Sequence, residues 1–114
     1  MKTVEEIHVG SRVNVPAHEI LLLKADNNYT EIFLINGRKI LSSTTMGTIE
    51  KRLNDFDFFR PNRSTVINLQ YLEKVEMKRI SNSNLSIRSN KKQKALNIKI
   101  SRRRRASLFA LINA

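Results

Sequence analysis

Four consecutive arginines near the C-terminus, in the segment Ser101-Arg102-Arg103-Arg104-Arg105, are the residues best suited to chemistry in this chain. The apolar pattern that follows places them at the start of a helix, where the macrodipole opposes positive charge and each exposed cation costs roughly 0.3–1 kcal/mol. A bound phosphate would offset that cost, because backbone N–H groups and guanidinium groups both donate hydrogen bonds to its oxygens. The segment therefore predicts a phosphate site. A solvated basic face that only aids solubility is the alternative interpretation.

A second polar group lies in residues 58–68, which read FFRPNRSTVIN. Asn62, Arg63 and Ser64 stand there between an aromatic anchor and a short apolar strand. Arg can read guanine and Asn can read adenine, while all three side chains can bond phosphate. The segment predicts a loop that contacts nucleic acid, and an ordinary connecting loop of similar composition is the alternative.

The charge of the chain is unevenly distributed. Lys and Arg number 21 against 10 Asp and Glu, which gives a formal charge of +11. Residues 1–76 hold ten charges of each sign, whereas the chain from Lys78 onward holds eleven cations and no acid. Such segregation costs self-repulsion and is typical of proteins with a polyanionic partner. Charge alone leaves DNA, RNA and an anionic membrane surface open.

Residues for catalysis or for a cofactor are poorly represented. His8 and His18 lie in strand-like segments without a triad partner, and Asp55 and Asp57 would point to opposite faces of an extended segment. The chain has no cysteine, which excludes thiolate zinc sites and cysteine nucleophiles, and its three glycines form no phosphate-binding loop. We therefore expect no enzyme, no cofactor and no metal site.

The elements that must position these residues are mostly strands, because short apolar runs alternate with turn residues over the first hundred positions. The continuous aliphatic residues of 19–25 predict a buried strand, and Asn36-Gly37 is a strong hairpin signal. A further hairpin is expected at Gly10-Ser11. The other expected strands are 29–35, 38–42, 65–68, 71–77, 85–89 and 96–100.

Two helices are expected. One follows a cap at Thr44 or Thr45, and Gly47 within it costs about 1 kcal/mol relative to Ala. The other would begin after Ser101 as its cap. No aliphatic run exceeds Ile20–Leu23, far below the roughly 20 residues of a membrane span, and no signal peptide is present, so we expect a cytoplasmic protein of one domain, 1–114.

These motifs, in this order, resemble the LytTR family of DNA-binding domains found in bacterial transcription regulators. The segment FFRPNRSTVIN is similar to the family signature, and the strand Ile20–Leu23 leads into NNYT at 27–30 as in that family. A helix ending in EKRL at 50–53 and the pair Ser101-Arg102 before the last helix complete the resemblance. It covers roughly residues 7–112.

The resemblance implies a mainly β fold of elongated antiparallel sheets with short flanking helices at about 44–54 and 102–112. It also implies that loops, not a recognition helix, enter successive major grooves of DNA. The DNA-binding residues expected on this basis are Asn28, Tyr29, Thr30, Asn62, Arg63, Ser64, Lys99, Arg102 and Arg103. Two positions depart from the family pattern. Asn62 replaces the customary His, which leaves the expected fold and DNA binding intact but leaves the preferred base sequence open, and Thr65 replaces the frequent aromatic. Asn68 is expected to be a structural hydrogen-bonding residue.

The leading hypothesis is therefore sequence-specific binding of double-stranded DNA, with repeated half-sites and a second copy of the chain on the same DNA. The chain would be a stand-alone regulator or a fragment that lacks a receiver or a membrane segment. An RNA-binding module is one alternative, for which Tyr29 and Tyr71 would be the stacking residues. A peripheral membrane binder is another, using Arg102–Arg105 and an apolar helix face that we expect instead to pack on the sheet. That face consists of Leu108, Phe109, Leu111 and Ile112.

Overall fold

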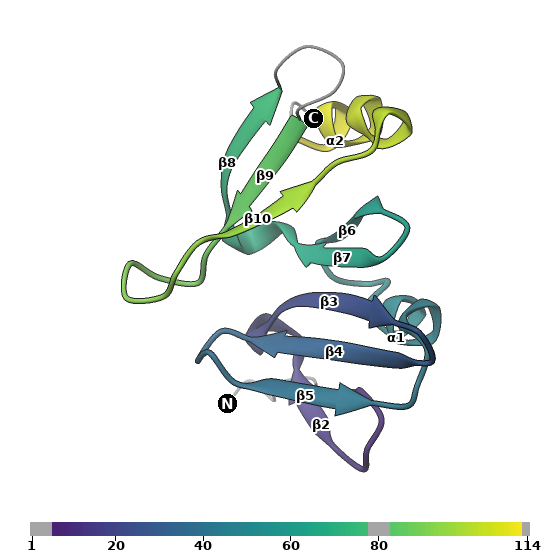
Figure 1. Cartoon of the computed structure of the whole chain (residues 1–114). Helices are drawn as coiled ribbons and strands as arrows, with labels where there is room; N and C mark the ends of the chain where they lie inside the picture. The colour runs from purple at the N-terminus through teal and green to yellow at the C-terminus, as the bar shows by residue number, and fades with distance from the viewer. Residues whose placement is uncertain (1–5, 78–82, 113–114) are drawn as a thin grey trace.

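The computed structural model describes residues 6–77 and 83–112, and Figure 1 shows that antiparallel strands are their main regular structure. The strands are β1 (Glu6–His8), β2 (Asn14–Pro16), β3 (Ile20–Asp26), β4 (Tyr29–Leu34), β5 (Lys39–Ser42), β6 (Phe58–Asn62), β7 (Thr65–Asn68), β8 (Leu72–Met77), β9 (Ser83–Ile87) and β10 (Leu96–Lys99). The α-helices are α1 (Met46–Arg52) and α2 (Arg105–Ile112). Three 3-10 turns, Ala17–Glu19, Leu69–Tyr71 and Arg102–Arg104, connect them. The predicted mainly β fold with two short helices is confirmed.

Strand β3 is the centre of the fold. It lies in a five-stranded sheet of order β5-β4-β3-β7-β6, hydrogen-bonded to β4 on one side and to β7 on the other. Its residues Ile20 and Leu23 belong to one hydrophobic core, and Leu21 and Leu22 belong to another. A strand covered on both faces needs apolar residues at successive positions, which explains its continuous aliphatic run. The predicted buried strand is confirmed.

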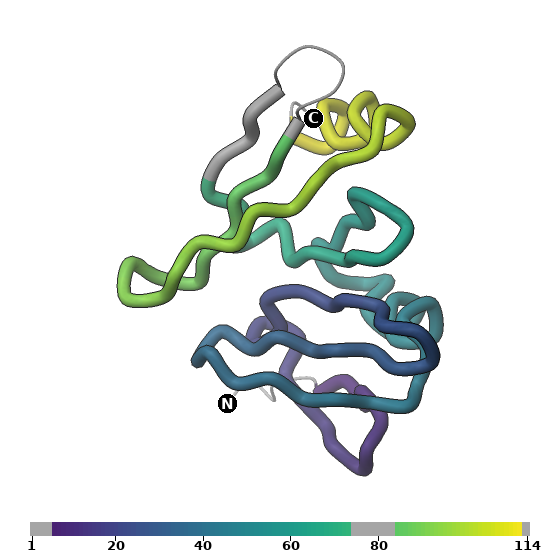
Figure 2. Tube along the Cα trace, in the orientation of Figure 1, coloured from purple at the N-terminus to yellow at the C-terminus, as the bar shows by residue number. Residues whose placement is uncertain are grey.

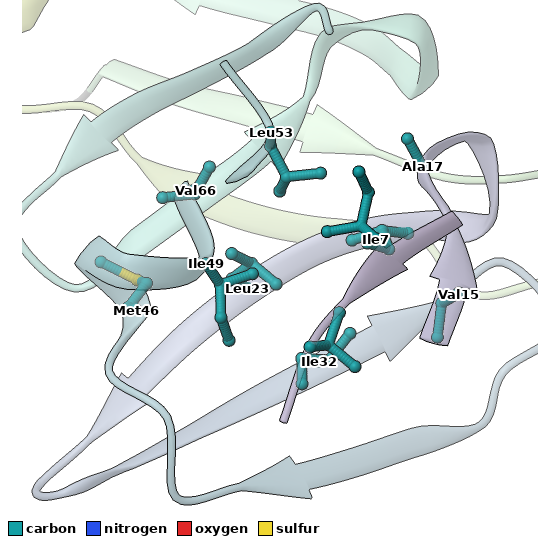
Figure 3. Packing of buried hydrophobic residues seen from close by; sticks show 11 residues of the cluster. Ile7, Val15, Ala17, Leu23, Ile32, Met46, Ile49, Leu53 and Val66 are labelled. Atoms are coloured by element: carbon teal, nitrogen blue, oxygen red, sulfur yellow. The ribbon is translucent and has the colours of Figure 1, made fainter. Parts of the chain in front are cut away.

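The first core lies between this sheet, the β1–β2 hairpin and α1. Figure 3 shows Ile7 and Val15 from the hairpin, Ile49 from α1, and Leu23 and Ile32 from the sheet, pointing toward one another. Thr45, one of the two predicted caps, accepts a hydrogen bond from the Thr48 backbone N–H at the start of α1. This cap compensates in part for Gly47 within a helix of only seven residues.

The second core joins the other side of the sheet to a three-stranded sheet of order β10-β9-β8 and to α2. Leu85, Ile87 and Leu108 are fully buried there against Leu22 and Ile67. The two sheets and their flanking elements give a body of 42 × 36 × 28 Å (Figure 2). Its radius of gyration of 14.0 Å compares with about 13 Å for a compact chain of this length, so the elongation is modest.

Two predicted hairpin turns use glycines at positive φ. Gly37 has a φ of 88° between β4 and β5, and Gly10 has a φ of 89° between β1 and β2. A Cβ on Gly10 would also meet the side chains of Ser42 and Thr44, so both backbone conformation and space require glycine there.

Two parts of the sequence-based description need correction. The segment Phe58–Asn62, interpreted as an anchor and loop, is the edge strand β6, whose pairing with β7 shifts register between Phe59 and Asn62. Pro61 is tolerated because it lies on an edge strand at this irregularity. The last helix begins as a 3-10 turn at Arg102–Arg104, and Ser101 makes no side-chain capping hydrogen bond.

Candidate nucleic-acid interface

Three polar segments, residues 26–29, 62–64 and 99–103, meet on one edge of the molecule. We call this surface the polar edge; it lies on the right-hand side in Figure 1, where β3 passes into β4, β6 into β7, and β10 into the last helix. The Ala25 backbone N–H donates to the Ser64 carbonyl oxygen at 2.9 Å, which joins the first segment to the second. The Ser101 N–H donates to the Pro61 carbonyl oxygen, also at 2.9 Å, and joins the second to the third.

Asn62 strengthens the second of these connections. Its Nδ2 donates to the Lys99 carbonyl oxygen at 2.7 Å, while its Oδ1 accepts from the Ser64 backbone N–H at 2.9 Å and from the Ser64 hydroxyl at 3.2 Å. One half-buried amide therefore closes the β6–β7 turn and also links it to β10. In this arrangement Asn62 positions Arg63 and Ser64, both of which are exposed.

Arg60 and Arg104 support the polar edge from inside. The Arg60 Nη2 donates to the Arg63 carbonyl oxygen at 2.6 Å, and its Nη1 pairs with Glu50 on α1 at 3.1 Å. The Arg104 Nε donates to the Arg60 carbonyl oxygen at 2.9 Å, and its guanidinium lies 4.7 Å from the centroid of the Phe59 ring. These residues hold β6, the turn after it and the last helix together.

The four arginines of the last helix therefore do not act alike. Arg104 is half-buried, whereas Arg102 and Arg103 are exposed and form no ion pair or side-chain hydrogen bond with the residues that the structure describes. The phosphate site predicted for the whole run is thus restricted to fewer side chains. The spacing gave a signal for this, since Arg104 precedes the buried Leu108 by four residues and so shares its helix face.

The residues around the β3–β4 turn also differ from one another in their exposure. Asn28 is exposed, and the Tyr29 side chain is 51% exposed. Thr30, in contrast, is fully buried, and its hydroxyl donates to the Thr44 carbonyl oxygen at 2.7 Å. The structure therefore does not bring the Thr30 side chain to the surface with the other predicted residues. It fixes the backbone that leads into the Thr45 cap of α1.

The exposed charged side chains of the polar edge are predominantly cationic. Arg63, Lys99, Arg102 and Arg103 are exposed there, and Asp26 is the acidic residue within the three segments. The acid of α1 behind this surface, Glu50, is already paired with Arg60. Cations held on turns that protrude from sheets can contact phosphates and base edges, since Arg and Lys donate to both.

A family model for the LytTr DNA-binding domain matches residues 10–113. The chain belongs to the LytTR family. LytTR domains are DNA-binding domains of transcription regulators, and the resemblance noted from the sequence is thereby confirmed. A solved LytTr DNA-binding domain from Bacillus cereus is 17% identical, covers 100% of this chain and 99% of its own, and superposes with a TM-score of 0.66, which shows the shared fold. No curated protein matches this chain.

Other kinds of site find little support. LytTR is a DNA-binding family and not a family of enzymes. In the described ranges, 6–77 and 83–112, no three His, Asp or Glu side chains come together as metal ligands, and no helix is long and apolar enough to cross a membrane. His8 is exposed, and its Nδ1 lies 2.9 Å from the Asn14 amide oxygen across the β1–β2 hairpin. The predicted structural role of Asn68 agrees with its burial and with the hydrogen bond from its Nδ2 to the Ile20 carbonyl oxygen at 2.9 Å.

Proposed function

We propose that this LytTR domain binds double-stranded DNA in a sequence-specific manner, with the turns of the polar edge in the major groove, and so regulates transcription in the cytoplasm. The observation that carries the proposal is the connection of all three polar segments by backbone and Asn62 hydrogen bonds. Segments that are already fixed lose less conformational freedom on binding, which favours affinity. The whole chain, 1–114, would act as one DNA-binding unit.

The exposure of each side chain suggests its role. Arg63, at the tip of the β6–β7 turn, and Arg102 are the best candidates for base contacts, because a guanidinium can donate two hydrogen bonds to guanine. Arg103 and Lys99 would neutralise phosphates, and the Ser64 hydroxyl would donate to one. The remaining proposed contacts, Asn28 and Tyr29, would enter a neighbouring part of the groove. Asn62 and Thr30 would act by positioning these residues.

One copy of the chain presents one such edge, so repeated half-sites would place two copies side by side on the same DNA. Contact between the two copies on the DNA would raise the affinity of the second copy without a stable dimer in solution. Titration of the chain with duplexes carrying one or two copies of the selected site would measure this. Tighter binding of the second copy than of the first would support it.

The function is tested by selection from random duplexes, followed by fluorescence anisotropy on the selected site. If Arg103 and Lys99 each neutralise one phosphate, log affinity should fall linearly with log salt with a slope of about −1.8, and the slope would approach about −3.6 only if Arg63 and Arg102 contact phosphates as well. Arg63→Ala should cost roughly 1–3 kcal/mol of binding free energy and relax the preference at one position if Arg63 reads a base. A matched control is Arg38→Ala, since Arg38 is exposed at the opposite end of β4 and should leave specificity unchanged.

Two outcomes would contradict the proposal. Tighter binding to single-stranded RNA than to any selected duplex would favour the RNA alternative, in which a base would stack on the exposed Tyr29 ring. Sedimentation with anionic vesicles at physiological salt, unaffected by competing duplex, would favour the membrane alternative. Equal weakening of all duplexes by Arg63→Ala would make Arg63 a phosphate contact and leave the reading of bases to Arg102.

A further inference from the structure

Helix α2 leaves most of its apolar side exposed. Leu108 is fully buried, as expected of a helix packed on a sheet, but Phe109, Leu111 and Ile112 are 44%, 53% and 47% exposed. The expectation that this whole face packs on the sheet is therefore wrong for three of its four residues. Large exposed apolar side chains grouped on one element often mark a binding surface.

A cavity of about 640 Å³, roughly half open to solvent, lies beside the end of this helix, with Leu111 and Ile112 in its wall. Leu69 and Leu72, from the 3-10 turn before β8 and from β8 itself, contribute further apolar surface. Cavities that hold small organic molecules have volumes of about 300–1,000 Å³ and combine apolar walls with a few polar groups. The size and the wall of this cavity fit a small molecule.

Two carboxylates supply the polar groups. Asp55 and Asp57 both line the cavity, although an extended segment would point them to opposite faces. The reason is that residues 53–57 form a turn, in which the Phe56 N–H donates to the Leu53 carbonyl oxygen at 3.0 Å and the Phe58 N–H to the Phe56 carbonyl oxygen at 2.9 Å. Neither carboxylate forms an ion pair or side-chain hydrogen bond with the described residues, so both are available to a ligand.

The sign of this charge is opposite to that of the chain as a whole. The chain holds 21 Lys and Arg and a formal charge of +11, yet among the residues that the structure describes no Lys or Arg lines the cavity. A metal ion is not the expected occupant, because in the part of the chain that the structure describes Asp55, Asp57 and the nearby His18 do not form a metal-ligand group. An organic cation satisfies both the carboxylates and the apolar wall. Phe56 and Phe58 also line the cavity, and an aromatic face attracts an ammonium group.

We propose that this cavity is a binding site for a small organic cation with an apolar body, such as an alkyl or aryl ammonium. The ammonium group would lie against Asp55 and Asp57, and the hydrocarbon would cover the exposed surface of Leu111 and Ile112. The cavity shares no residue with the polar edge, so the inference does not depend on the proposed function. Binding can be measured on the chain without DNA.

The test is an NMR titration of the ¹⁵N-labelled chain with hexylammonium, using hexanol and hexanoate as neutral and anionic probes of similar length. We expect saturable shifts of the amides of residues 55–58, 69–72 and 111–112 with hexylammonium, weaker binding of hexanol and none of hexanoate. Lengthening the alkyl group of the ammonium probe from butyl to hexyl should raise its affinity by up to about fourfold per methylene, the value for complete burial of a methylene group. The double variant Asp55→Asn with Asp57→Asn should weaken hexylammonium binding at least tenfold.

Asp26→Asn is the matched control, because Asp26 is an exposed carboxylate on the polar edge, away from the cavity. It should leave hexylammonium binding unchanged. The ¹⁵N spectrum of each variant reports whether the fold is retained, and the single variants serve if the double variant unfolds. Shifts spread over all surface carboxylates, equal binding of hexanol and hexylammonium, or equal effects of the Asp26 and Asp55/Asp57 variants would each overturn the proposal.

Discussion

Replacement of Asn62 by Ala tests whether this residue acts through the fold or by direct contact with DNA. The change removes the hydrogen bond to the Lys99 carbonyl oxygen at 2.7 Å and the one from the Ser64 N–H at 2.9 Å. The contact with the Ser64 hydroxyl, at 3.2 Å on an exposed side chain, is readily replaced by water. Each hydrogen bond contributes about 0.5–1.5 kcal/mol net, and the site is only half-buried, so the expected loss of unfolding free energy is about 1–2 kcal/mol.

For a domain of 114 residues the entropy of unfolding is about 0.24 kcal/mol/K, so this loss lowers Tm by about 4–8 °C. Thermal unfolding followed by circular dichroism measures it. Asn97→Ala is the matched control, because Asn97 is exposed on β10 and makes no side-chain hydrogen bond with the described residues. Its Tm should stay close to that of the unmodified chain.

The same variant should weaken binding to all duplexes by a similar factor, because the turn that presents Arg63 loses its Asn62 bond to Lys99 and is held to this segment by fewer hydrogen bonds. One result would refute this reasoning. If Asn62→Ala leaves Tm unchanged and removes the preference for one base pair, Asn62 reads a base directly, as the sequence alone predicted. The hydrogen bonds within the protein would then be exchanged for contacts with DNA.

Two further predictions concern stability. Gly47→Ala should raise the unfolding free energy by about 0.5–1 kcal/mol, since Gly47 lies in α1 and a Cβ there would meet none of the described atoms within 4 Å beyond the helix's own backbone. Gly10→Ala should lower the unfolding free energy, because the φ of Gly10 is 89° and a Cβ would meet the side chains of Ser42 and Thr44. Urea unfolding measures both changes. Burial raises the pKa of Tyr71 above its usual 10.0, and the nearby Glu19 carboxylate raises it further. The Tyr71 hydroxyl donates to the His18 carbonyl oxygen at 2.7 Å. The folded state thus favours the neutral phenol, so this contribution to stability is complete below pH 10 and is lost as pH rises through the folded pKa. In Tyr71→Phe the part of the fall in unfolding free energy that comes from this phenol should be absent at alkaline pH. An equal fall in both proteins between about pH 9 and 11 would contradict the contribution of Tyr71.

Much of the fold follows from local sequence. The aliphatic run of β3 indicates a strand buried on both faces, and the Asn36-Gly37 turn fixes the β4–β5 hairpin, because these signals depend on side-chain hydrophobicity and backbone conformation. The local sequence of strand β6 does not predict a strand. Pro61 lowers the strand propensity of its segment, and only its place on the sheet edge makes the strand possible.

For the polar edge, too, some properties follow from the local sequence and others from contacts between distant segments. The residue types, the excess of positive charge in the C-terminal third and the ordered motifs of the LytTR family can all be recognised in the sequence. Which of those side chains reach the surface depends on contacts between segments that are distant in the chain. Thr30 and Tyr29 are adjacent in the chain, yet one is buried and the other exposed, since neighbouring residues of β4 face opposite sides of the sheet and only one side is covered there. Likewise, Arg104 packs on Phe59 while Arg102 and Arg103 stay exposed. The spacing to Leu108 indicates which helix face Arg104 shares, but its burial depends on contacts with residues more than forty positions away.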